Sequence, residues 1–208
     1  MRRATILAVL LAAIVGGGFG SASASTLCKV NQNPCAEENQ WPSHSIILFL
    51  SKHTTIVSPV TVSCHSHIST LEERTFFNLI LVRFKLFDWE LCEGCTSVTV
   101  PKLPDAQLAA TSGGNGTITT TSSAELELKG CPFGITCKAT ITNAKLAFIG
   151  GTIGNTATVK AEKVPVSMSG FGCGSSGTWN AGVESTSPYV VTSVNGSTTG
   201  SIFVSAEP

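Results

Sequence analysis

The feature that most constrains this chain is its set of eight cysteines, all of which follow residue 27: Cys28, Cys35, Cys64, Cys92, Cys95, Cys131, Cys137 and Cys173. An even number of cysteines predicts pairing as disulfides, provided that the chain leaves the reducing cytosol, where thiols stay reduced. The cysteines therefore make export a precondition of the expected fold.

The N-terminus has the pattern of an export signal. Residues 1–3 are a short basic start, residues 6–15 are an unbroken apolar run, and small residues stand at 22–24 where a signal peptidase reads. This pattern predicts a secretory signal peptide over 1–24, because the apolar run is shorter than the roughly 20 residues that span a bilayer. We expect residues 25–208 to form a single disulfide-stapled β domain, secreted or held at the cell surface, with no membrane span after cleavage.

The spacing of the cysteines suggests how they pair. Two local bridges, Cys28–Cys35 and Cys131–Cys137, would each close a small loop that contains proline. The other four cysteines allow three pairings, and we favour Cys64–Cys92 together with Cys95–Cys173. A bridge that closes a loop of tens of residues should stabilise the fold by about 3–4 kcal/mol.

Composition favours strands and gives little electrostatic signal. Charged residues make up 12% of the chain, whereas Thr, Ser, Gly and Val are abundant, as is typical of pleated strands with small polar turns. The predicted signal holds two of the thirteen basic residues and none of the thirteen acidic ones, which leaves a net charge of −2. A net charge of −2 gives no sign of a basic surface that would attract nucleic acid or anionic lipid.

Short apolar runs separated by turn signals predict the architecture. Leucines alternate with charged residues over 124–129, and residues 75–87 form a longer run that is apolar on both faces at first. The Asn-Gly pairs at 115–116 and 195–196 are strong hairpin signals. We predict an all-β fold: an antiparallel β-sandwich, or barrel-like sandwich, of roughly ten to twelve strands stapled by disulfides.

Two histidines beside two cysteines form the sharpest candidate site. On a strand, His65 and His67 would point to the same face, and a nearby C-x-x-C pair, Cys92 and Cys95, could complete a tetrahedral zinc site. Cys64 would point to the opposite face, and an exported chain favours oxidised cysteines. We therefore interpret this region as a disulfide beside two surface histidines, and we predict no metal and no cofactor.

Candidate catalytic residues are also interpreted as structural. Ser175 and Ser176 lie in a glycine-rich run, but neither has the flanking glycines of G-x-S-x-G, so a tight turn anchored by a disulfide is the better interpretation. Glutamates at 72–73, and Asp88 with Glu90, could serve a glycosidase only across a cleft, and we interpret them as solvated loop charges. No catalytic residue is predicted.

Several segments together resemble a group of small exported proteins of actinobacteria. They are TLCK at 26–29, NPC at 33–35, VTVSC at 60–64, CEGCTSVTV at 92–100, GNGTI at 114–118, GITC at 134–137, FGCGSSGTW at 171–179 and SPYV at 187–190. The resemblance covers nearly the whole chain after the signal, and its motifs are cysteines, turns and one tryptophan. It implies a shared fold, and it carries over no functional residue, since the group has no established function.

These observations favour a non-enzymatic exported protein that acts as a binding or structural module at the cell surface or outside the cell. Loops on a stiff scaffold would contact a partner that the sequence does not identify, and the candidates are a cell-wall glycan or another surface protein. Trp179 could stack on sugars, but its place in a strand predicts core packing. The alternatives are a secreted hydrolase of polysaccharide or peptide, and a small-ligand or metal carrier that uses His65 and His67.

Overall fold

The computed structural model describes residues 25–74, 79–183 and 185–206. The predicted signal at 1–24, and the first part of the strand predicted over 75–87, lie outside these residues. Within them are three short 3-10 segments, η1 (Glu37–Asn39), η2 (Ser112–Gly114) and η3 (Pro132–Gly134), and no helix there is long and apolar enough to cross a membrane. The strands are β1 (Ser25–Cys28), β2 (Ile46–Val57), β3 (Val62–Arg74), β4 (Ile80–Glu93), β5 (Ser97–Lys102), β6 (Asp105–Ala110), β7 (Gly116–Thr120), β8 (Ala124–Cys131), β9 (Ile135–Ile141), β10 (Lys145–Ile149), β11 (Gly151–Thr152), β12 (Thr158–Ser169), β13 (Ser176–Ala181), β14 (Tyr189–Val194) and β15 (Ser201–Ala206).

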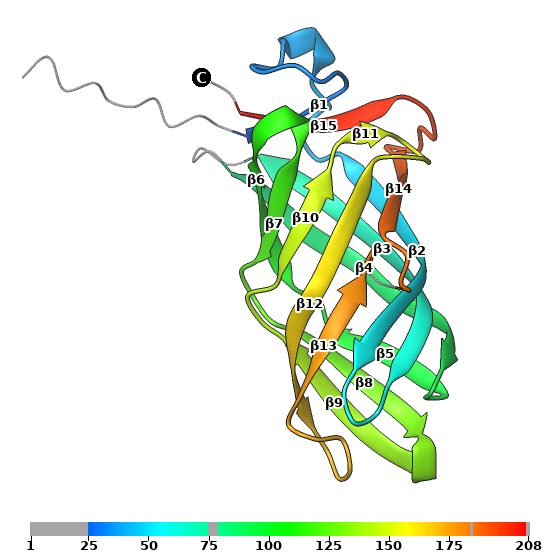
Figure 1. Ribbon diagram of the computed structural model, residues 1–208. Coiled ribbons are helices and arrows are strands. Elements are labelled where there is room, and N and C mark those ends of the chain that lie inside the picture. The colour runs from blue at the N-terminus through cyan, green and yellow to red at the C-terminus, as the bar shows by residue number, and fades with distance from the viewer. Residues whose placement is uncertain (1–24, 75–78, 184, 207–208) are drawn as a thin grey trace, which may run out of the picture.

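Twelve of these strands form one antiparallel sheet that closes on itself (Figure 1). β2, β3, β4 and β12 are long and unbroken, and each is one strand path of the closed sheet. Each of four other paths consists of two shorter strands that follow one another: β5 and β6, β7 and β8, β9 and β10, and β13 and β14. Each path pairs with the next in chain order, and the last returns to β2 through both β13 and β14. The sheet is therefore an up-and-down ring of eight paths, which leaves its described strands without an open edge.

Breaks and bulges at mid-height allow this closure. Leu103-Pro104 separates β5 from β6, and Asn143, with a positive φ of 51°, lies between β9 and β10. In the unbroken strands the register shifts instead, between Ser51 and Thr54 in β2 and across 161–164 in β12. An extra residue bends a strand and increases its twist, which a closed sheet of long strands requires.

The ring interior is the hydrophobic core. Along β3 the residues at 62, 64, 66, 68 and 70 are buried and their neighbours in between are half-exposed, as the two-residue period of a strand dictates. Aromatic rings run through this interior from Trp89 to Phe87, Trp179 and Tyr189, with neighbouring ring centroids 5.6–6.0 Å apart. The predicted core packing of Trp179 is confirmed.

The two ends of the ring are closed differently, and we name them accordingly. At the capped end, β1, β15 and β11 form a three-stranded sheet that buries Leu27, Ile202 and Val204 over the core. The segment after β1 is fixed there by the Cys28–Cys35 disulfide and by the Trp41 indole, which donates to the carbonyl of Ser201 at 3.2 Å. At the stapled end, four turns join β2 to β3, β4 to β5, β8 to β9 and β12 to β13, and no strand of the described chain covers them (Figure 1).

The predicted all-β, antiparallel, disulfide-stapled fold is confirmed, and its closed sheet corresponds to the barrel-like form of that prediction. All eight cysteines are in disulfides. The predicted bridges Cys28–Cys35 and Cys64–Cys92 are both present. The second joins β3 to β4 at the stapled end, where the register of these two strands shifts between Ser63 and His65.

The other two predicted bridges are wrong. The structure has Cys95–Cys131 and Cys137–Cys173 in place of Cys131–Cys137 and Cys95–Cys173. In the β8–β9 pairing Cys131 lies opposite Ile135, so the two cysteines of this hairpin are out of register. Each bonds instead on its other side: Cys131 to Cys95 in the turn between β4 and β5, and Cys137 to Cys173 in the turn after β12. Sequence separation favoured the short loop, but strand register decides the pairing.

Candidate functional site

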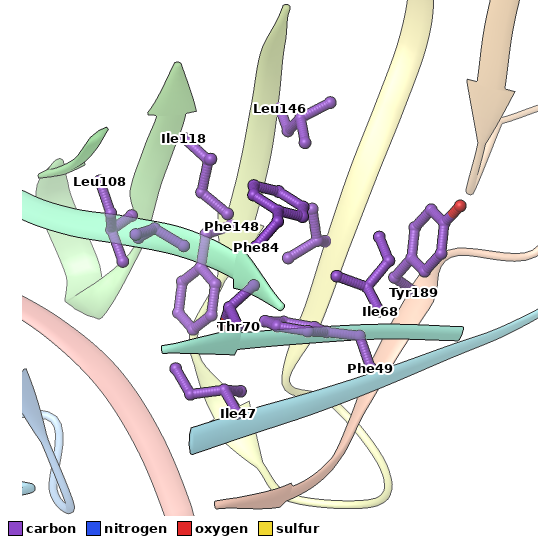
Figure 2. A pocket seen from close by; sticks show the side chains of 12 residues that line it. Ile47, Phe49, Ile68, Thr70, Phe84, Leu108, Ile118, Leu146, Phe148 and Tyr189 are labelled. Atoms are coloured by element: carbon purple, nitrogen blue, oxygen red, sulfur yellow. The ribbon is translucent and has the colours of Figure 1, made fainter. Parts of the chain in front are cut away.

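The interior of the ring near the capped end contains a small apolar cavity (Figure 2). Every one of the eight strand paths contributes at least one side chain to its wall, and the side chains in Figure 2 converge from all sides. The lining residues are Ile47, Phe49, Ile68, Thr70, Val82, Phe84, Leu108, Ile118, Leu146, Phe148, Val159 and Tyr189. The cavity volume is about 20 Å³.

This cavity is part of the core and too small for a ligand. One water molecule needs at least about 10–15 Å³ and about two to four polar partners, and these walls are almost entirely apolar. The exception is Thr70, whose buried hydroxyl has no hydrogen-bond partner among the described residues. The interior therefore has the packing of a filled core, and a carrier function would need a different conformation.

A belt of polar groups crosses the interior beside the aromatic rings. The hydroxyl of Tyr189 donates to the hydroxyl of Ser66 at 3.0 Å, and the indole of Trp179 donates to the hydroxyl of Thr54 at 2.9 Å. Burial raises the pKa of Tyr189 from 10.0 to about 12, although hydrogen bonds with these neighbours oppose the shift. The belt gives these buried polar atoms hydrogen-bond partners inside the core.

The two candidate metal-binding histidines lie on the outer face of β3. Nε2 of His67 lies 3.8 Å from Oε2 of Glu90 on β4, and both side chains are about half exposed. Cys64 faces inward and is bonded to Cys92, so neither can act as a thiolate ligand. Across the described residues, no three His, Cys, Asp or Glu side chains gather closely enough to hold a metal ion.

The candidate catalytic residues do not converge. Ser175 lies in the turn that follows Cys173, and Ser176 begins β13. The predicted loop position of these carboxylates is wrong, because they lie on strands. Asp88 and Glu90 lie on β4 and face solvent as predicted, whereas Glu72 lies on β3 with 1% of its surface exposed. Glu72 and Glu90 thus face opposite sides of one sheet, because a strand alternates its side chains.

Among the described residues, the largest exposed apolar side chains are at the stapled end, and sequence reasoning missed them. Phe133 is fully exposed, at 102%, in the η3 turn between β8 and β9, and Phe171 is 93% exposed in the turn between β12 and β13. Phe133 has a φ of 65°, in the left-handed region that phenylalanine rarely adopts. The turn motifs were visible in the sequence, but they do not reveal which way a ring points.

These two turns are neighbours, and disulfides fix both. β9 pairs with β12, with Lys138 opposite Ser169, and the Cys137–Cys173 bridge ties β9 to the turn that holds Phe171. On the other side, Cys131 precedes the Phe133 turn and is bonded to Cys95. All three cysteines next to the turns are buried, so the backbone that presents the two rings is held to the core.

Of the exposed large apolar side chains in the described residues, Phe133 and Phe171 are the most exposed, and core packing does not explain their position. A phenylalanine in the core would gain about 1.5–3 kcal/mol from burial, a gain that these two rings forgo. The pair is therefore the candidate functional site, at the end of the ring opposite the cap. Comparison of the chain with protein-family models, with curated proteins and with solved structures gives no match.

Proposed function

We propose that this chain is an exported, non-enzymatic protein that acts at the cell surface or outside the cell as a binding module, and that its stapled end makes the contact. One observation carries the proposal: Phe133 and Phe171 stand in water at two neighbouring turns that disulfides hold rigid. Exposed apolar groups reduce solubility, so a surface that keeps two of them at one place is typical of an interaction site.

Two further observations support this function. Four disulfides are typical of proteins that work outside the reducing cytosol, in agreement with the basic and apolar segment over 1–24. The apolar cavity near the capped end has a volume of only about 20 Å³, which favours the outer surface as the place of contact with a bound molecule. A rigid ring with exposed turns at one end suits that role.

A sedimentation assay tests the proposal. The full chain is produced in a host that exports it, and protein from the medium is mixed with peptidoglycan, cell-wall polysaccharide or phospholipid vesicles. We expect the wild-type protein to sediment with at least one of these, and the double variant Phe133→Ser/Phe171→Ser to bind at least about tenfold more weakly. Both rings are exposed, so the variant should keep the wild-type melting temperature.

Two results would contradict the proposal. Release of soluble fragments from polysaccharide or peptide would assign the protein to the secreted hydrolases instead. Undiminished binding by the folded double variant would show that the stapled end is not the contact.

A further inference from the structure

The chemistry of the two phenylalanine turns restricts what they can bind. Residues 130–137 and 168–177, which include both turns, contain no Asp, Glu, Lys, Arg or His. The two turns themselves therefore carry no charged side chain, and glycines at 134, 170 and 172 are next to the two phenylalanines in sequence. We call these two turns, residues 130–137 and 168–177, the tip. The tip can be transferred out of water without the cost of desolvating a charged group.

The shape and size of the tip argue against a protein partner. The rings stand on turns and are almost fully exposed, so they form projections and no groove. A phenylalanine can bury about 150–250 Å², so two rings together cover at most about 500 Å². Stable protein–protein interfaces bury about 800 Å² on each partner, more than these two rings alone can cover. The partner must accept two inserted rings without requiring a broad flat contact.

The outer layer of a phospholipid bilayer accepts such insertion, because apolar side chains bury about 5–10 Å deep between headgroups and acyl chains. We propose that Phe133 and Phe171 insert together into the surface of a bilayer of zwitterionic phospholipid, a partner class that rests on the binding function proposed above. The chain after the predicted signal has a net charge of −2, so attraction to anionic lipid does not contribute. The disulfides beside both turns hold the turn backbone before binding, so no loop has to become ordered.

Co-sedimentation with phosphatidylcholine vesicles tests this inference. We compare the wild-type protein, Phe133→Ser, Phe171→Ser, the double variant, and the matched control Leu86→Ser, which removes a 49% exposed leucine from the outer face of β4. Each phenylalanine variant should lower the partition coefficient about tenfold or more, and the double variant about a hundredfold. Leu86→Ser should bind like the wild type, and neither phosphatidylglycerol nor added salt should strengthen binding.

A second readout follows the ring itself. Trp89 and Trp179 are buried, so a Phe133→Trp variant adds one exposed indole whose fluorescence should shift to shorter wavelength when phosphatidylcholine vesicles are added. Absence of that shift, or of wild-type binding to phosphatidylcholine, would overturn the inference. Binding that needs anionic lipid and is reversed by salt would overturn it as well.

The failure of this inference can be separated from the failure of the proposed function. If the protein binds peptidoglycan or another surface protein in a way that the double variant loses, the partner class is wrong and the binding function stands. If the protein binds neither vesicles nor any envelope component, both are wrong.

Discussion

Raising the pH should reveal that Tyr189 is a neutral group buried in the core. Tyr189 is the one tyrosine of the chain, and burial raises its pKa from 10.0 to about 12. In the unfolded chain the phenol loses its proton near pH 10, whereas in the folded protein it keeps the proton to about pH 12. The unfolded state therefore binds fewer protons between these values, and the stability of the folded state falls as the pH rises through this window.

The magnitude follows from the shift. Two pKa units correspond to about 3 kcal/mol, so the Tyr189 contribution to unfolding free energy should be complete below pH 10 and should fall by about 3 kcal/mol by pH 12. At neutral pH a Tyr189→Phe variant should be less stable than the wild type by about 1 kcal/mol, because it loses the 3.0 Å hydrogen bond to Ser66. The two effects have opposite signs. The stabilities of the two proteins should therefore cross between about pH 10 and 11, above which the variant is the more stable.

The assay is urea unfolding of both proteins at a series of pH values, followed by the fluorescence of the buried tryptophans. Lysine ionisation affects both proteins alike, so the difference between their unfolding free energies isolates Tyr189. Tyrosinate absorbance provides a second measurement, since it should stay low in the folded protein near pH 11 and rise on addition of urea. A difference in stability that does not change with pH, or immediate ionisation of the folded protein near pH 10, would refute the reasoning.

Two further predictions concern the core and the stapled end. Thr70→Val should raise the free energy of unfolding by about 1 kcal/mol because it removes an unpaired buried hydroxyl. The matched Thr120→Val should lower it by about 1–2 kcal/mol, since that hydroxyl accepts the amide of Ala144 at 2.8 Å, and effects of equal sign in urea unfolding would contradict this reasoning. Replacing Cys95 and Cys131 together by alanine should cost about 4 kcal/mol, because the bridge spans 36 residues, whereas a cost below about 1 kcal/mol would mean that strand pairing alone fixes this end.

The strands were predictable because their signal is local. Alternation of apolar and polar residues over 124–129 matches β8, and turn residues such as Leu103-Pro104 mark real breaks between strands. The closure of the sheet was not predictable, because the pairing of β2 with β13 and β14 joins segments more than a hundred residues apart. No local sequence pattern indicates that breaks in two different strand paths lie at the same level along the closed sheet.

The errors at the stapled end have the same origin. Cys131 and Cys137 are close in sequence, and the sequence contains no sign that the hairpin between them places them out of register. Glu72 was interpreted as a loop charge, because its partner strand, and hence the face on which it lies, was unknown. Phe133 and Phe171 were passed over for a related reason, since an apolar residue in a turn can fold back on the core or project from it.

The difference between the two ends of the closed sheet explains why the exposed phenylalanines are at the stapled end. A closed sheet of long strands exposes its core at both ends, and the capped end solves this problem with β1, β15 and β11, whose apolar residues cover the interior. At the opposite end, disulfides from Cys64 to Cys92, from Cys95 to Cys131 and from Cys137 to Cys173 constrain the strand ends without adding a covering layer. The turns there remain rigid and uncovered at once, whereas a cap would have buried them. The disulfides at this end of the closed sheet thus hold the turns of Phe133 and Phe171 in place, and both side chains stay exposed to a partner.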